Sequence, residues 1–295
     1  MSWPMSASAP KKRNDRAAYF LVLPFVAVYA VLFVYPTAQM LWSSLTSQGL
    51  IVAGDFTGVQ NYARLLSDPR LMKAIVNTTQ FVLMTVVPGT LIGLMLALMV
   101  NRLKGVVQGV VLAVLFLPYM LPVTTVVLIW NWVIYGPFQL VWFAVMHRPL
   151  NLAVQSWMLL PIVAVLTIWW TAGFNVLILL GGLRSIPPDL YEAARIDGAG
   201  RRAQFSAITW PLMRPFLLLV LTIQLIWQIK VFDQVYLMAQ GTRSDVSIVL
   251  VQYIYLLAFQ NDKGGYAASV AVALFVVVVA ISLMQAQLLA RGRKS

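Results

Sequence analysis

Six apolar runs, each long enough to cross a lipid bilayer as a helix, constrain this chain more than any other feature. The hydrocarbon core of a bilayer requires about 20 residues of helix, and backbone polar groups inside it must be paired within the segment. The runs cover residues 17–42, 74–100, 106–134, 157–180, 216–237 and 266–289. Because only 10% of the residues are charged, against about 25% in soluble domains, we predict an all-α, polytopic membrane protein with six transmembrane helices.

The distribution of positive charge predicts how these helices are oriented. If both termini are cytoplasmic, fourteen of the 21 lysines and arginines lie on the cytoplasmic side, six lie on the opposite side, and Lys230 lies within a span. This asymmetry orients helical membrane proteins, so the net charge of +12 requires no nucleic-acid partner. We predict a cytoplasmic N-terminal segment at 1–16, a transmembrane domain in the lipid bilayer at 17–290 and a basic cytoplasmic tail at 291–295.

On the extracytoplasmic side, a short polar segment shows helical spacing. Tyr62, Leu65 and Leu66 recur on one side of a helical pattern that stops before Pro69. We expect a short helix on the membrane surface, with an ordered loop as the alternative.

The longest soluble-looking segment lies in the predicted cytoplasmic loop at 183–214. A proline pair and Asp189 suit the first turn of a helix, and Glu192, the only glutamate of the chain, follows within it together with an alanine pair. Gly198 then interrupts the pattern, and a second helical pattern leads into the fifth run. We predict a helix–turn–helix beside the membrane, whose small residues allow another surface to approach closely.

Polar side chains inside the apolar runs should face a bundle interior or a watery cavity, because they are costly in lipid. Prolines recur in the runs, and each tends to kink its helix. Gln224 and Gln228, one turn apart, are candidate lining groups, since neutral amides both donate and accept hydrogen bonds. Lys230 and Asp233 are close enough to pair on one helix face, as a structural pair or as a substrate contact. The other polar candidates for the path are Tyr119, Asn131, Thr171 and Asn175.

Several kinds of chemistry lack the residues that they need. The run GAGRRA at 198–203 fits a dinucleotide fingerprint formally, but it lacks the preceding strand. No phosphate-binding loop occurs, so we expect no cofactor and no ATP in this chain. His147 is the only histidine and there is no cysteine, which leaves no metal-ligand pattern and little basis for an intramembrane enzyme. A secondary transporter or channel is the alternative, although such proteins usually carry ionic groups at mid-membrane.

A spaced pattern in the cytoplasmic loop is more specific than its composition. It consists of Glu192-Ala193-Ala194, then Gly198 after three residues, and then Ile208 and Pro211. This pattern resembles the EAA loop of permease subunits from binding-protein-dependent ABC importers, with Trp210 where that family usually has leucine. The segments LFLPYMLP, NYARLLSDPRLMKAIVNT and VFDQVYLM resemble the carbohydrate-uptake branch, and within it the first, maltose-F-type permease.

The resemblance implies a type I ABC importer permease fold in the bacterial cytoplasmic (inner) membrane. The implied partners are a second homologous permease, two ATP-binding subunits that hold ATP and Mg²⁺, and an extracytoplasmic solute-binding protein. The residues expected to dock on the ATPase are Glu192, Ala193, Ala194, Asp197 and Gly198. The positions that contact sugar in the maltose type match Tyr119, Thr171, Phe174, Trp227 and Gln228. The expected solute is a sugar or a related polyol or glycerol-phosphate compound.

Overall fold

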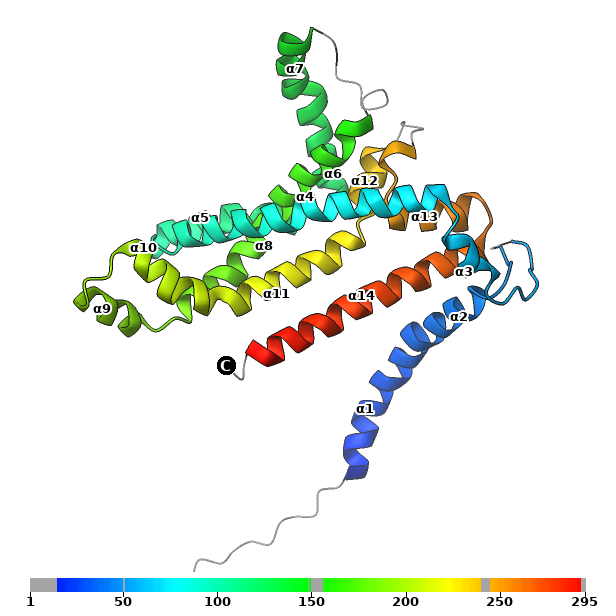
Figure 1. The fold of residues 1–295 in the computed structure, drawn as a ribbon, viewed down its shortest axis with the longest axis horizontal. Coiled ribbons are helices and arrows are strands. Elements are labelled where there is room, and N and C mark those ends of the chain that lie inside the picture. The colour runs from blue at the N-terminus through cyan, green and yellow to red at the C-terminus, as the bar shows by residue number, and fades with distance from the viewer. Residues whose placement is uncertain (1–14, 50, 148, 150–155, 240–244, 293–295) are drawn as a thin grey trace, which may run out of the picture.

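The regular structure of the chain is helical (Figure 1), in a computed structural model that describes residues 15–49, 51–147, 149, 156–239 and 245–292. The α-helices are α1 Asp15–Tyr29, α2 Tyr35–Ser43, α3 Gln60–Leu65, α4 Pro69–Val100, α5 Gly105–Phe116, α6 Val123–Val133, α7 Gln139–Met146, α8 Leu159–Arg184, α9 Pro188–Ile196, α10 Arg201–Gln204, α11 Trp210–Ile229, α12 Asp233–Met238, α13 Leu250–Tyr255 and α14 Gly264–Gly292. These residues contain one isolated β-bridge, between Thr46 and Phe56, and no strand. The predicted all-α class is confirmed.

Six helical segments of the described chain are long and apolar enough to cross a membrane, as predicted. They are Phe20–Ser43, Pro69–Val100, Val123–Met146, Leu159–Arg184, Arg201–Ile229 and Gly264–Gln287. In Figure 1, α4, α8, α11 and α14 lie lengthwise beside one another, with α9 and α10 at one end of this bundle and α3 near the other. We call these the α9 end and the α3 end. The segment with helical spacing before Pro69 forms a short helix, α3.

The bundle is built on the contacts among α4, α8 and α11. One buried apolar cluster contains Ala97 of α4, Leu179 of α8 and Val220 of α11. The backbones of α4 and α8 approach closely at Gly93, where an added Cβ would lie 2.7 Å from the Cβ of Asn175. Small residues of this kind let membrane helices pack by van der Waals contact, which matters because lipid removes the usual hydrophobic driving force between helices.

The third predicted span, at 106–134, is wrong in its boundaries because the helix breaks in its middle. α5 ends at Phe116, and a 3₁₀ turn separates it from α6. Leu121 has an extended backbone with ψ of 140°, because the ring of Pro122 disfavours a helical conformation of the residue before it. The segment long enough to span is Val123–Met146, whose α7 part projects away from the bundle (Figure 1).

The fifth predicted span, at 216–237, differs from the structure at both ends. α10, a π-helical turn and α11 form one segment, Arg201–Ile229, so the helix begins earlier than predicted. The helix stops there, and α12 starts at Asp233 after a non-helical Phe232. Lys230 and Asp233 therefore do not share a helix face, and no ion pair joins them in the described part of the chain.

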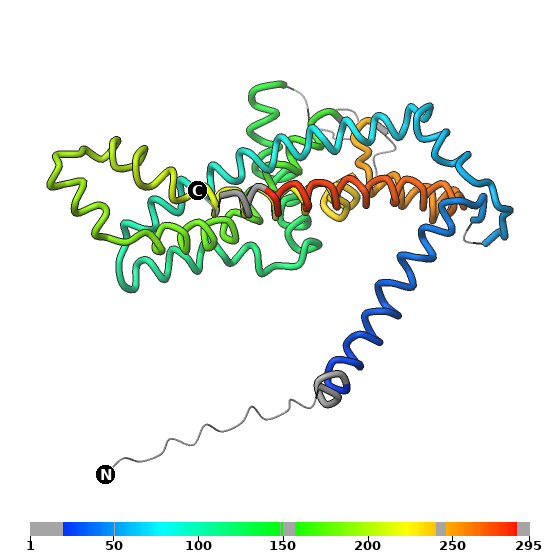
Figure 2. Tube along the Cα trace, turned by 60° about the horizontal axis from the view of Figure 1, so that its bottom comes forward, coloured from blue at the N-terminus to red at the C-terminus, as the bar shows by residue number. Residues whose placement is uncertain are grey.

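The first span is formed by α1, a π-helical turn and α2; its α2 end contacts α14, and from there the span diverges from the bundle towards α1 (Figure 2). None of the residues in the most apolar stretch of this span is buried by the rest of the chain. Large side chains such as Phe20, Leu21 and Phe25 are exposed. An apolar helix that its own chain leaves uncovered must face lipid or another protein.

The predicted orientation can be tested with single cysteines, because the wild-type chain contains none. Ser67 is exposed at the α3 end and Ser206 is exposed next to α10. In spheroplasts, a membrane-impermeant maleimide should label Ser67→Cys at once, whereas Ser206→Cys should be labelled only after permeabilisation. The cysteine-free chain is the blank, and the reverse labelling pattern would contradict the orientation.

Candidate functional site

The α9 end carries a helix–turn–helix, as predicted for the cytoplasmic loop. α9 has Asp189 in its first turn and ends in a Schellman arrangement. The Gly198 N–H donates to the Arg195 carbonyl at 3.1 Å, and the Ala199 N–H donates to the Ala194 carbonyl at 2.8 Å. Gly198 has a φ of +77°, a left-handed conformation that favours glycine over residues with a side chain. This glycine therefore sets the angle between α9 and α10.

The side chains of this motif face away from the bundle. Of the five expected docking residues, Ala194 is half-buried and four are exposed, namely Glu192, Ala193, Asp197 and Gly198. Glu192 contacts Arg195 at 3.8 Å, with both side chains largely exposed, and a surface pair of this kind stabilises a protein by only about 0–1 kcal/mol. The apolar Ile196 beside them is 87% exposed. α9 thus presents a carboxylate, small residues and an apolar side chain that its own chain leaves largely uncovered.

Three aromatic rings meet where the break between α5 and α6 faces the bundle, and we call them the aromatic trio. Tyr119 lies on the 3₁₀ turn Leu117–Met120, Phe174 on α8 and Trp227 on α11. The ring centroids lie 5.2 Å apart for Tyr119 and Phe174, 6.2 Å for Tyr119 and Trp227, and 5.0 Å for Phe174 and Trp227. Trp227 is 38% exposed and the other two rings are half-buried. The trio is therefore a partly accessible apolar surface built from three separate elements.

A chain of buried amides, which we call the amide ladder, joins α11, α8 and α4. Gln228 Nε2 donates to Gln224 Oε1 at 2.9 Å, and Gln224 Nε2 donates to Asn175 Oδ1 at 2.7 Å. Asn175 Nδ2 then donates to the Gly89 carbonyl at 3.2 Å. All three amide side chains are at most 3% exposed. Gln224 and Gln228 were expected to line a cavity, whereas in this structure they are paired with groups of the bundle itself.

The other candidates for the path lie outside both groups. Thr171 is buried, and its hydroxyl donates to the Thr167 carbonyl of its own helix at 2.9 Å. Asn131 is half-buried on α6, while Lys230 and Asp233 are exposed beyond the end of α11. Among the described residues, no side-chain hydrogen bond or ring contact joins these four to the aromatic trio or to the amide ladder.

At the α3 end, Asp68 connects three helices through a single carboxylate, and we call this group the Asp68 clamp. One oxygen caps α4 by accepting from the N–H groups of Arg70 and Leu71 at 2.9 and 3.3 Å. The other accepts from the hydroxyls of Tyr253 on α13 and Tyr266 on α14 at 2.5 and 2.6 Å. Asp68 was not among the residues predicted from the sequence, although an aspartate directly before a proline and an apolar helix is a recognised N-cap pattern.

The hydrogen bonds of the clamp favour the charged form of the carboxyl. Burial opposes ionisation, but the two tyrosine hydroxyls and the two backbone N–H groups outweigh it and lower the pKa of Asp68. Burial, with a further contribution from the neighbouring carboxylate, raises the pKa of Tyr253. The clamp is therefore an ionised carboxylate held by neutral hydroxyls.

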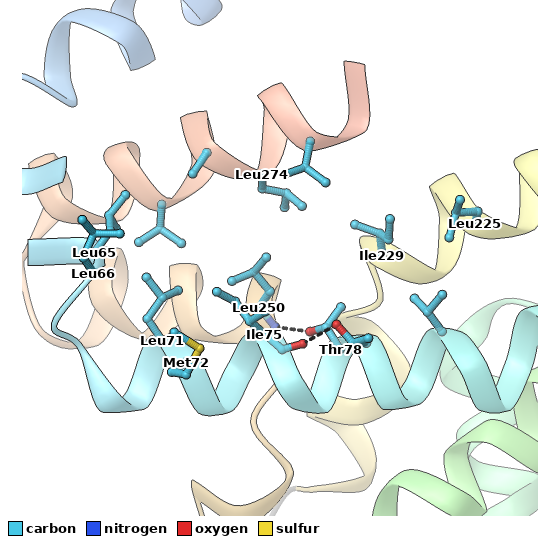
Figure 3. Close-up of a pocket in the computed structure, with 15 residues that line it drawn as sticks. Leu65, Leu66, Leu71, Met72, Ile75, Thr78, Leu225, Ile229, Leu250 and Leu274 are labelled. Atoms are coloured by element: carbon cyan, nitrogen blue, oxygen red, sulfur yellow. Dashed lines mark hydrogen bonds between the residues drawn. The ribbon is translucent and has the colours of Figure 1, made fainter. Parts of the chain in front are cut away.

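An apolar groove of about 440 Å³ lies between α4, α11 and α14 (Figure 3). Ile75 of α4, Ile229 of α11 and Leu274 of α14 are among its lining residues. Its threonines offer little polarity, because Thr78 donates to the Ala74 carbonyl and accepts from the Leu250 N–H. The groove is an open apolar surface in the spanning region, so it requires lipid or another protein to cover it.

Comparison with known proteins shows that the chain belongs to the family of inner membrane components of binding-protein-dependent transport systems. The model of this family matches residues 89–294. The matched part includes the aromatic trio, the amide ladder and the loop that carries α9.

Relatives are similar over almost their whole length. The trehalose/maltose transport system permease protein MalF of Thermococcus litoralis is 30% identical over 285 residues, which cover 93% of this chain and 94% of the relative. The arabinooligosaccharides transport system permease protein AraP of Bacillus subtilis is 28% identical over 280 residues, which cover 92% and 88%. A solved bacterial ABC transporter involved in the import of the acidic polysaccharide alginate matches with a TM-score of 0.81 at 23% identity, covering 95% of this chain and 96% of the other. The last likeness shows the fold.

These findings make the chain a multi-pass inner-membrane permease subunit of an ABC importer. They confirm the family and the location predicted from the spaced pattern in the loop. Membership of a family of transport components disfavours the alternative of a transporter or channel that works alone.

The Asp68 clamp predicts a loss of stability in Asp68→Ala. This variant removes the cap of α4 and the shared acceptor of two hydroxyls, so we expect a loss on the order of 2 kcal/mol, measured by thermal unfolding in detergent. Because the carboxyl's pKa is lowered from 3.8, its contribution is present above about pH 4 and disappears as the pH falls through the lowered value.

The stability difference between the wild type and Asp68→Ala should therefore shrink at about pH 3 relative to pH 7. Asp68→Asn serves as the control, since it keeps an acceptor oxygen for the cap but cannot ionise. A difference that is equal at the two pH values would contradict the ionised clamp.

Proposed function

We propose that this chain forms half of the translocation path of an ATP-driven importer for a sugar or a related polyol or glycerol-phosphate solute. The observation that carries the proposal is the outward-facing motif on α9, in a chain whose spans belong to a transport family. Relatives named for arabinooligosaccharides and for trehalose/maltose support the solute class. ATP and Mg²⁺ belong in this proposal to two separate ATPase subunits.

The coupling role is supported by the geometry of the α9 end. Glu192 is free to leave Arg195 for a basic group of the ATPase, because their surface contact is weak. Ala193 and Ala194 allow close approach, and Ile196 adds apolar area to the same exposed helix. Movement of the docked helix would then rock the spans as rigid bodies and expose the path to each side in turn.

Within this proposal, the aromatic trio lines the translocation path. Ligand sites are mostly apolar and aromatic surfaces with a few convergent polar groups, and the Tyr119 hydroxyl provides a polar group beside the half-exposed rings of Phe174 and Trp227. Rings of this kind can cover the apolar face of a sugar. The hydrogen bond from Gln224 to Asn175 joins α11 and α8, the helices that carry the rings of Trp227 and Phe174, and Gln228 donates to Gln224.

Two surfaces support a second homologous permease as partner. The first span of this chain is an apolar helix whose most apolar stretch has no buried residue. The groove between α4, α11 and α14 is an apolar surface that the described chain leaves uncovered. An extracytoplasmic binding protein is supported by the family description and by a fold neighbour that was solved in complex with a periplasmic protein.

Replacing Glu192 tests the docking role without disturbing the fold. Glu192→Lys changes an exposed side chain, so the permease should remain as stable as the wild type. The ATPase should bind at least about tenfold more weakly, because an unpaired or repelling charge at an interface costs roughly 2 kcal/mol or more. Co-purification with the ATPase and solute-stimulated ATP hydrolysis measure the effect, and Glu192→Gln separates the loss of charge from its reversal.

Gly198→Leu should weaken docking by a different route, since its backbone φ of +77° strains any residue with a side chain. Gly200→Leu is the matched control, because Gly200 has a φ of −69° and an added Cβ there has open space. If Glu192→Lys and Gly198→Leu both keep the wild-type rate of solute-stimulated ATP hydrolysis, the docking role is refuted.

Trp227→Ala should slow uptake by about threefold to tenfold, the loss expected for one aromatic contact. The measurement is transport of radiolabelled maltose, trehalose and arabinotriose into proteoliposomes that contain the full complex and its binding protein. Trp132→Ala on α6, where the side chain is 70% exposed, is the control and should transport at the wild-type rate. If Trp227→Ala and Trp132→Ala take up every transported sugar at the same rate, the aromatic trio does not line the path.

A further inference from the structure

Tyr191 faces the opposite way from the motif that follows it in the sequence. Glu192 and Ala193 are exposed, whereas Tyr191 is half-buried and packs against the apolar cluster of α4, α8 and α11. Ile208, which precedes α11, packs against the same cluster. α9 therefore has an outward side available to a partner and an inward side that rests on the spans.

The inward side ends in a hydrogen bond to the residue directly before α11, within the fifth span. The hydroxyls of Tyr191 and Thr209 lie 2.8 Å apart, and Thr209 is only 6% exposed. The other hydrogen bonds and ion pairs made by side chains of α9 in the described chain stay within the helix, since Arg195 Nε donates to the Tyr191 carbonyl and its guanidinium pairs with Glu192. The Tyr191–Thr209 bond is thus the polar side-chain link between α9 and a span.

Thr209 occupies a special place in the backbone. It is the last residue of the π-helical turn Phe205–Thr209, which joins α10 to α11. Pro211 and Pro215 follow in α11, and each lacks the N–H that would bond the preceding turn. Single π-helical turns inside α-helices occur frequently at functional sites, and here the turn weakens the backbone ladder where α11 begins.

Two routes therefore connect α9 with α11. The backbone route passes through the glycine turn at 198–200 and through the four residues of α10. The side-chain route is direct, because one hydrogen bond joins residues that lie 18 positions apart. A force applied to α9 can reach α11 through a short, partly buried contact that does not depend on the glycine turn.

We infer that the Tyr191–Thr209 hydrogen bond is a strut that transmits the movement of α9 to α11, and that Tyr191 is a positioning residue for coupling. The inference rests on the proposed docking of α9 on an ATPase. α11 also carries Gln224, Trp227 and Gln228, so the strut joins the docking helix to the helix that supplies both the amide ladder and one ring of the aromatic trio.

The test measures the number of solute molecules transported per ATP hydrolysed, in the complete complex in proteoliposomes, with maltose and trehalose as probes. Tyr191→Phe keeps the ring and removes the hydroxyl, and Thr209→Val removes the other hydroxyl. Each should lower the ratio by about threefold to tenfold, as expected for the loss of one hydrogen bond, while the ATPase still co-purifies. Thr209→Ser keeps a hydroxyl and should retain the wild-type ratio.

The double variant Tyr191→Phe/Thr209→Val should be no worse than the poorer single variant, because both remove the same interaction. Tyr62→Phe is the matched control. It removes a bond of the same chemistry and the same sequence separation, between the Tyr62 and Ser44 hydroxyls at 2.7 Å, but at the α3 end, and it should leave the ratio unchanged.

An unchanged ratio in Tyr191→Phe and Thr209→Val, or fully additive effects in the double variant, would overturn the strut. Failure of the proposed docking gives a different result, since the ATPase would then co-purify as well with Glu192→Lys as with the wild type. If docking holds and the ratio is unchanged, only the strut is rejected.

Discussion

The structure depends on pairing polar groups inside a bundle that lipid surrounds. In hydrocarbon an unpaired amide is costly, so the hydrogen bonds from Gln224 to Asn175 and from Asn175 to the Gly89 carbonyl hold α11, α8 and α4 together. The close approach at Gly93 brings Asn175 within reach of α4. The two features support each other, because the small residue permits the contact and the hydrogen bond fixes its register.

Breaks in the helices then place the groups that the intact bundle would keep apart. Pro122 disfavours a helical Leu121, which is extended, and on the 3₁₀ turn that precedes it the ring of Tyr119 lies 5.2 Å from that of Phe174. Discontinuous helices recur at the substrate sites of membrane transporters for the same reason, since irregular backbone at this depth is tolerated only inside the protein or beside a cavity.

The two ends of the bundle are built for different tasks. At the α3 end, Asp68 accepts four hydrogen bonds and ties α4 to α13 and α14. At the α9 end, the motif residues are largely uncovered, and α9 is fastened from its inward side through Tyr191. The α3 end is thus held together by bonds within the chain, whereas the α9 end combines an exposed surface, where we propose that the ATPase docks, with a hydrogen-bonded link to a span.

The sequence by itself determined the number of spans, the helical class, the helix–turn–helix in the loop at 183–214 and the family, because these follow from long apolar runs and from glycine and proline at fixed spacing. Only the tertiary structure decided where the third and fifth spans break and which face each polar residue takes. Gln228 and Trp227 are neighbours in one apolar run, yet one is buried in the amide ladder and the other is half-exposed in the aromatic trio. Hydropathy measures whether a residue prefers lipid to water, and it carries no information on which neighbouring helix a side chain meets.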